Sequence, residues 1–223
     1  MLNPKSKKNN FSQNAKVIKY NNANILEKKF KDSKSLFIYI HQKIKNKNFI
    51  ISGGNTIKII LKHLNDKKNL LNNKVLLSDE RIVKNSSNLR NDSFYYGLIK
   101  KKLIIKENFY NFKSQFIDKT EALKLEKEIK KINLEIAILT LGKNGHVASI
   151  FQIEKKSKNN FYFIENCPKF PKKRFTISIN KLSKCKKIYL IARLMNRSKE
   201  IYNLEKNILL KKIKKKIELL IFP

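Results

Sequence analysis

The chain has 223 residues, enough for one substantial hydrophobic core, and no Pro-, Gly- or Ser-rich linker divides it, so a single domain over residues 1–223 is expected. Lys and Arg number 51 against 17 Asp and Glu, which gives a net charge of +34. The basic residues are spread along the chain, and Lys, Asn and Ile are abundant together, as AT-rich codon usage produces. The net charge by itself therefore excludes no functional class of protein. It predicts diffuse attraction to polyanions at low salt and no specific nucleic-acid partner.

The two cysteines and the first residues of the chain indicate which cellular compartment to expect. Cys167 and Cys185 have neither the spacing of a zinc site nor the density of a disulfide framework. The basic first residues lead into no apolar signal segment, and no apolar run is long enough to span a bilayer. We therefore expect a cytoplasmic protein with reduced thiols and no membrane partner.

The predicted elements alternate between strands and helices. In chain order they are a strand at 15–20, a helix at 23–45, a strand at 49–51, a helix at 56–64, a strand at 74–78, helices at 92–101 and 119–131, a buried strand at 134–141, strands at 161–164, 174–179 and 187–192, and a helix starting near Asn196. Residues 108–116 have no clear period, and residues 217–222 are an apolar tail. This alternation predicts an α/β fold of Rossmann-like type, with an open, mostly parallel sheet and helices on both faces.

A glycine turn joins the predicted strand 49–51 to the next helix. Its sequence, Ser52-Gly53-Gly54-Asn55-Thr56, allows successive amide groups and the helix start to face one point. Such an arrangement suits a phosphate, but two adjacent glycines also make a plain tight turn. On these residues alone both interpretations stay open.

Charged residues end the strand at 74–78. Asp79, Glu80 and Arg81 follow it directly, and a polar loop containing Ser87 and Asn88 comes next. Ligands of open α/β sheets bind at the carboxyl ends of the strands. These side chains are therefore expected either in solvent or in a ligand site.

The buried strand at 134–141 ends in a second glycine turn. Residues 142–145, Gly-Lys-Asn-Gly, lead to His146, which we expect at the carboxyl end of a central strand and at the start of a helix. A histidine titrates near neutral pH and suits acid–base chemistry, although a lone histidine is more often a polar packing residue. Further along, two prolines stiffen a loop that leads to Arg174 at the start of an alternating strand.

Four segments in this order resemble the 6-phosphogluconolactonase family. Residues 52–56 are similar to its Ser-Gly-Gly-Ser-Thr, residues 79–81 with Ser87-Asn88 to its Asp-Glu-Arg and Ser-Asn, residues 142–151 to its Gly-x-Asp-Gly-His-x-Ala-Ser-Leu-Phe, and residues 168–176 to its Pro-Lys-x-Pro-x-x-Arg-x-Thr. The related glucosamine-6-phosphate deaminases usually carry Tyr at the position of Arg81 and end the histidine segment in Asn-Glu-Pro. The resemblance therefore favours the lactonases.

The resemblance implies a NagB/RpiA/CoA-transferase-like fold and hydrolysis of 6-phospho-D-glucono-1,5-lactone in the oxidative pentose phosphate pathway, with no metal or organic cofactor. It implies His146 as the general base on water, with Arg81 and Asp79 beside it. The implied substrate- and phosphate-binding residues are Ser52, Gly53, Gly54, Asn55, Thr56, Asn88, Gly145, Lys169, Arg174 and Arg197. We expect the protein to act on this small phosphosugar lactone as a monomer or weak homodimer.

The chain departs from the family pattern at several positions. Asn144 replaces the usual Asp, Asn55 a Ser and Ile57 a Pro, and Arg197 stands near a lysine of the wider superfamily. The carboxyl-terminal segment is short. Two alternatives stay open: a glucosamine-6-phosphate deaminase-like phosphosugar enzyme, and a non-catalytic basic binding protein on the same fold.

Overall fold

The computed structural model of the chain describes residues 14–20, 23–113, 115–116, 118–142, 144–151, 159–194 and 217–223. In chain order its elements are β1 (Asn14–Tyr20), β2 (Ala23–Lys29), α1 (Ser33–Ile44), β3 (Phe49–Ile51), α2 (Asn55–Leu61), β4 (Val75–Leu77), β5 (Asp79–Arg81), α3 (Asp92–Lys100), the 3-10 helix η1 (Lys106–Asn108), β6 (Phe109–Tyr110), α4 (Lys119–Ile129), β7 (Ile136–Thr140), β8 (Phe161–Ile164), β9 (Arg174–Ile177), α5 (Ile179–Ser183), β10 (Lys187–Arg193) and β11 (Ile217–Phe222).

The main sheet has eight strands in the order β1-β2-β11-β10-β7-β3-β4-β6. All neighbours in it are parallel except β1, which pairs with β2 in antiparallel register at one edge. The predicted mostly parallel sheet is therefore confirmed. β7, which leads to His146, lies between β10 and β3 and is central, as expected.

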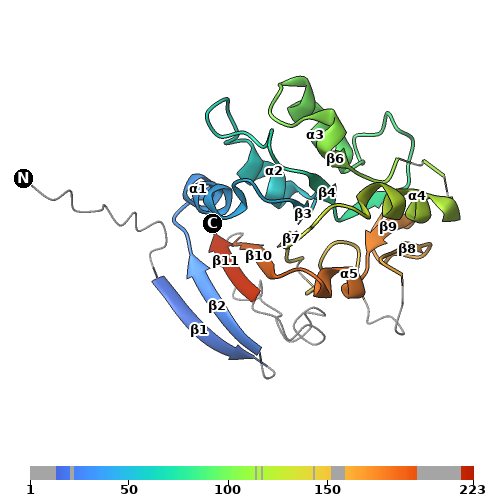
Figure 1. Cartoon of the computed structure of the whole chain (residues 1–223). Coiled ribbons are helices and arrows are strands. Elements are labelled where there is room, and N and C mark those ends of the chain that lie inside the picture. Colours follow the sequence, from blue (N-terminus) through green and yellow to red (C-terminus); the bar gives the residue numbers. More distant parts are fainter. Residues whose placement is uncertain are drawn as a thin grey trace, which may run out of the picture.

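Helices cover both faces of this sheet (Figure 1). One core cluster combines side chains of α1, α2 and α3 with one face, and a second combines α4, α5 and strands β8 and β9 with the other. β3 is buried on both faces: Ile50 belongs to one cluster, whereas Phe49 and Ile51 belong to the other. This burial explains why its sequence is continuously apolar. A strand buried on both faces has no polar alternation to show.

A second sheet of three antiparallel strands, β5-β9-β8, lies beside the main one. Its register pairs Asp79 with Thr176 and Arg81 with Arg174. Two motifs that are about 95 residues apart in the sequence therefore lie side by side. Sequence reasoning predicted β8 and β9 as strands without placing them in a separate sheet.

The predicted helix at 23–45 is wrong over its first part. Residues 23–29 form strand β2, and only Ser33–Ile44 are helical, after Asp32 caps the helix by accepting a hydrogen bond from the Ser35 amide at 2.7 Å. The reason is tertiary: β2 pairs with β11, whose residues 217–222 complete the sheet from the far end of the chain. Local periodicity does not register such a partner.

The predicted helix start after His146 is also wrong within the described residues. From His146 to Phe151 the chain makes tight turns, with an isolated bridge between Val147 and Ile150. Ala148 has a φ of 50°, which interrupts any helix at that point. The helix predicted near Asn196 lies outside the described residues, and the unassigned residues 108–116 contain the short strand β6.

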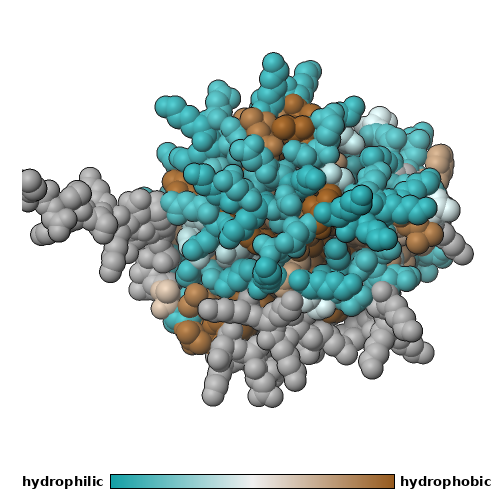
Figure 2. Space-filling model, in the orientation of Figure 1, coloured by the Kyte–Doolittle hydropathy of each residue, from teal (hydrophilic) through white to brown (hydrophobic). Residues whose placement is uncertain are grey.

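Hydrophilic side chains dominate the face of the molecule in Figure 2, and hydrophobic ones form small, separate patches. None of the described helices is both long and apolar enough to cross a membrane. The buried apolar side chains of the described residues belong mostly to the two core clusters.

Candidate active site

The carboxyl ends of β3, β4 and β7 lie along one edge of the sheet because the three strands are parallel. β3 leads into the glycine loop of residues 52–56, β4 into Asp79 of β5, and β7 into the turn that carries His146. In the same region β9 presents Arg174 beside Arg81. The four segments predicted to form a site therefore converge.

The glycine loop offers unused hydrogen-bond donors. None of the backbone amides from Gly53 to Thr56 donates to another group in the described part of the chain, and α2 has no side-chain cap. Ser52, by contrast, is buried, and its Oγ accepts a hydrogen bond from the Thr140 amide at 3.2 Å. Ser52 thus fixes the loop to β7, while the amides that follow are available to an anion.

The ring of His146 lies against the backbone of its own turn. A Cβ atom added to Gly142 would lie 1.9 Å from the His146 Cε1, so only glycine fits there. On another side the ring stacks on Phe151, with 4.3 Å between centroids and 16° between planes. The turn itself is held by the Gly145 amide, which donates to the Gly142 carbonyl at 2.9 Å.

One imidazole nitrogen is engaged and the other is left as an acceptor. His146 Nδ1 contacts the Oδ1 of Asn144, and because an amide oxygen only accepts, this contact assigns the proton to Nδ1 and the lone pair to Nε2. Burial, followed by the positive charges of Lys169 and Arg174, lowers the pKa of His146 to about 4. The histidine is therefore neutral near pH 7 and able to accept a proton.

Asp79 anchors a chain of polar contacts behind the histidine turn. Its carboxylate accepts hydrogen bonds from Ser78 Oγ at 2.8 Å and from Ser149 Oγ at 2.7 Å, and all three side chains are buried. Ser149 in turn accepts from Arg174 Nη1 at 3.3 Å. Asp79 thus positions the His146 turn through Ser149 and does not contact the imidazole in this structure.

The guanidinium of Arg174 organises the proline loop. It is buried and donates to the carbonyls of Pro171 at 2.9 Å, Lys169 at 3.1 Å and Phe170 at 3.3 Å, as well as to Ser149. Most of its five N–H groups are therefore used within the protein. Lys169, at the exposed side of the same loop, lies close enough to His146 for its charge to lower the histidine pKa.

Arg81 has two other cations near it, Arg174 on the neighbouring strand β9 and Lys58 on α2. Its Nη1 donates to the Leu89 carbonyl at 2.6 Å, while its buried Nε has no partner among the described residues. Burial lowers the pKa of Lys58 on α2, the charge of Arg81 lowers it further, and Glu80 opposes them. Lys58 and Arg81 are therefore near neighbours beside the glycine loop, and an anion between them would relieve their repulsion.

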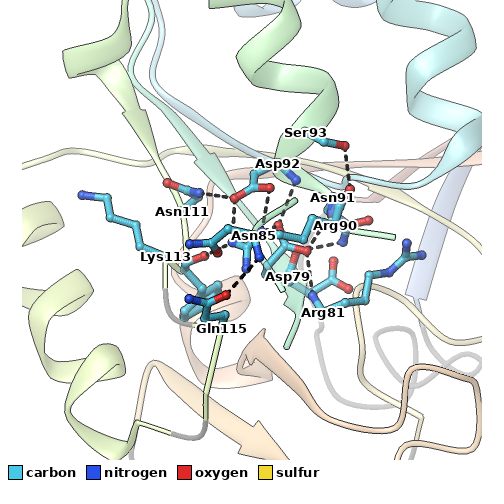
Figure 3. A network of polar contacts seen from close by, with 12 residues as sticks. Asp79, Arg81, Asn85, Arg90, Asn91, Asp92, Ser93, Asn111, Lys113 and Gln115 are labelled. Carbon is cyan, nitrogen blue, oxygen red and sulfur yellow. Dashed lines mark hydrogen bonds and ion pairs between the residues drawn. The ribbon is translucent and has the colours of Figure 1, made fainter. Parts of the chain in front are cut away.

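A buried network of ion pairs and hydrogen bonds lies next to Asp79 and Arg81 (Figure 3). Arg90 donates to Asp92 at 2.9 and 2.6 Å and lies 3.8 Å from Glu80. Glu80 accepts hydrogen bonds from the amides of Arg81, Asn91 and Asp92 at 2.7, 2.7 and 2.8 Å. Burial and the nearby Asp92 carboxylate raise the pKa of Glu80 to about 7, against the lowering effect of these amides and of Arg90.

The remaining predicted residues are placed less centrally. Asn88 is exposed in a turn of the loop before α3, and Asn55 is exposed in the first turn of α2, with Thr56 half-buried next to it. Arg197 lies outside the described residues. Among the described residues, no group of three His, Cys, Asp or Glu side chains is arranged to hold a metal ion.

Sequence reasoning missed three residues that the structure places at this edge: Lys58, Glu80 and Asn91. Lys58 follows the glycine loop closely enough to reach back from the first turns of α2. Glu80 was noted only as a member of a charged triplet. Asn91 had a readable signal, since an Asn directly before an amphipathic segment typically begins a helix, but nothing local indicates that its side chain turns away from that helix.

The fold and the site define an α/β protein that gathers a neutral histidine, several cations and a loop of free amides at the carboxyl edge of its sheet. The chain belongs to the glucosamine-6-phosphate isomerase/6-phosphogluconolactonase family, whose model matches residues 32–203.

Solved structures support the fold. A 6-phosphogluconolactonase from Thermotoga maritima superposes with a TM-score of 0.70 at 20% identity, covering 88% of this chain and 99% of that one. The enzyme from Plasmodium vivax gives 0.70 at 17% identity, covering 92% and 91% of the two chains. The enzyme from Trypanosoma brucei gives 0.66 at 16% identity, covering 88% and 95%. A comparison with curated protein sequences gives no significant match.

Proposed function

We propose that the protein hydrolyses 6-phospho-D-glucono-1,5-lactone to 6-phospho-D-gluconate, with His146 as the general base. The observation that carries this proposal is the pairing of a histidine of lowered pKa with a loop of amides near several cations, where both the His146 Nε2 and the amides lack a partner among the described residues. A phosphorylated ester substrate needs both: a grip for the phosphate and a base for water. The family and its solved structures carry the matching name.

The phosphate is assigned to the loop amides of Gly53 to Thr56, with Lys58 and Arg81 as its proposed cationic partners. Neither these amides nor the buried Arg81 Nε have a hydrogen-bond partner among the described residues, so binding of an anion by them would break no existing hydrogen bond. Lys169 and Arg174 add positive charge near His146. Arg197 is part of this proposal from the sequence alone.

The chemistry then needs few groups. A water oxygen attacks the ring ester carbonyl while His146 Nε2 takes one of its protons, and the carbonyl oxygen becomes an oxyanion that the surrounding cations stabilise. When the carbonyl re-forms, the bond to the ring oxygen breaks, and the imidazolium returns its proton to that leaving oxygen. The resulting carboxylic acid ionises in solution, so each turnover releases one proton.

Ser149 has no part in this scheme as a nucleophile. Its hydroxyl donates to Asp79, accepts from Arg174 and is completely buried. A nucleophilic serine needs a neighbouring base such as histidine and an exposed oxygen. The proposed role of Asp79 and Ser149 is to hold the His146 turn and Arg174 in place.

A proton-release assay tests the proposal. Purified protein with freshly made 6-phospho-D-glucono-1,5-lactone should consume base faster than the spontaneous hydrolysis does, and should produce 6-phosphogluconate. Ammonia release from glucosamine 6-phosphate with no lactone hydrolysis would instead support the alternative of a glucosamine-6-phosphate deaminase-like enzyme, and the family name includes glucosamine-6-phosphate isomerases. Neither activity, together with sequence-dependent nucleic-acid binding, would support the binding protein.

A further inference from the structure

Asn91 occupies the N-cap position of α3, but its side chain does not cap this helix. An Asn at this position normally caps its own helix by accepting a hydrogen bond from an amide of the first turn. Here it makes no such bond. Instead its Nδ2 donates a hydrogen bond to the Asp79 carbonyl at 2.9 Å. The Glu80 carboxylate accepts hydrogen bonds from the backbone amides of Asn91 and Asp92.

The same side chain fills the space above the glycine loop. A Cβ atom added to Gly53 would lie 2.3 Å from the Cβ of Asn91 and 2.9 Å from its Oδ1. Asn91 is only 2% exposed, and its Oδ1 has no hydrogen-bond partner within the described residues. A buried side-chain amide whose oxygen has no hydrogen-bond partner is costly to keep unless the contact serves another purpose.

We propose that Asn91 is a positioning residue that couples the glycine loop to the Asp79–Arg81 strand. Glu80 fixes the backbone of Asn91, the Asn91 Nδ2 fixes β5, and the body of the side chain packs against Gly53. Figure 3 shows Asn91 beside Asp79. The loop that grips phosphate and the strand that presents Arg81 are thereby held in one geometry. This inference rests on the proposed function for the role of the loop.

A double-mutant cycle with inorganic phosphate as the probe tests the coupling. Gly53→Ala should weaken phosphate binding by about tenfold or more when Asn91 is present, because the new methyl group collides with it. In an Asn91→Gly background, where the colliding atoms are absent, the same change should weaken binding by less than about threefold. Glycine is tolerated at a helix start, so the background variant is expected to fold. Thermal unfolding of all four proteins checks this.

A second measurement separates positioning from a general structural role. Asn91→Ala removes the contact with the Asp79 carbonyl and should raise the KM for the phosphorylated lactone with a smaller change in kcat. Its loss on the unphosphorylated lactone should be clearly smaller than its loss on the phosphorylated one. Ser86→Ala, an exposed substitution in the same loop, is the matched control and should alter neither.

The outcomes decide between the claims. Equal effects of Gly53→Ala in both backgrounds, or equal losses on both lactones for Asn91→Ala, would overturn the role of Asn91. A parent protein that binds no inorganic phosphate would overturn it as well. A parent protein that binds phosphate but does not hydrolyse the phospholactone would contradict the proposed function alone, since the phosphate cycle still measures the coupling.

Discussion

The imidazole of His146 is held by three different contacts: Gly142 beneath it, Phe151 stacked on it and Asn144 at Nδ1. Together they fix the ring plane and leave Nε2 as the acceptor. Such restraint is what a general base needs, because proton transfer depends on a fixed hydrogen-bond geometry. Substitutions of His146 and Asn144 test this arrangement directly.

His146→Ala should lower kcat on the phospholactone by about a hundredfold or more while leaving inorganic phosphate binding within a small factor of the parent. The base is lost, but the loop amides are untouched. Steady-state kinetics and calorimetry on the same preparations measure the two effects. Near-parental turnover would remove His146 as the base.

Asn144→Asp should move the acid limb of the pH profile of kcat/KM upward by about one unit. A carboxylate at the Nδ1 contact favours the imidazolium, so it raises the pKa of His146 from its lowered value of about 4. The base works only when unprotonated, and a higher pKa therefore costs activity at the acid end first. If the acid limbs of the two proteins coincide, either residue 144 does not act on His146 or His146 is not the titrating base; His146→Ala distinguishes these cases.

At the scale of elements, local pattern predicts some parts of this edge well and others poorly. The buried strands β3 and β7 and the turns after them are readable because apolar runs and glycines are local signals. Sequence periodicity predicts a helix over β2 because its partner β11 is more than 190 residues away. Glu80 and Asn91 act through contacts across the loop before α3, and no spacing rule in the sequence reveals such contacts.

The proline loop gives an element-scale prediction. Arg174→Lys should fail to restore what Arg174→Ala loses, because a single ammonium cannot donate to the carbonyls of Lys169, Phe170 and Pro171 and to Ser149 at once. Both variants should lower the free energy of unfolding by roughly 2–4 kcal/mol. Both should also weaken phosphorylated-lactone use more than unphosphorylated-lactone use, since Lys169 loses its support and positive charge near the site is misplaced. Denaturant unfolding and paired kinetics measure these effects. Full recovery in Arg174→Lys would show that charge alone matters.

At the scale of the whole molecule, the α/β class, the parallel sheet and the convergence of four motifs were all predictable, since parallel strands bring their carboxyl ends to one edge whatever their order. The separate antiparallel sheet was not predictable in the same way. It forms because Asp79–Arg81 pair with Arg174–Thr176 instead of continuing β4, a choice made by tertiary contacts. The net charge is likewise a property of the whole molecule.

A charge of +34 on a hydrophilic surface predicts binding to duplex DNA that depends on salt and not on sequence (Figure 2). Diffuse contacts between lysines and phosphates gain their free energy from released counterions, so the affinity should fall by about two orders of magnitude or more between roughly 50 and 200 mM salt. Duplexes of unrelated sequence should compete equally, because no base edge is read. Phospholactone hydrolysis should be much less sensitive over the same range, since the proposed phosphate site consists of a few fixed backbone amides and neighbouring cations. Fluorescence anisotropy with two unrelated duplexes, run beside the lactonase assay at each salt concentration, measures both responses. Binding of one duplex that persists at 200 mM salt while the other is lost would mean that the basic surface has a specific nucleic-acid partner.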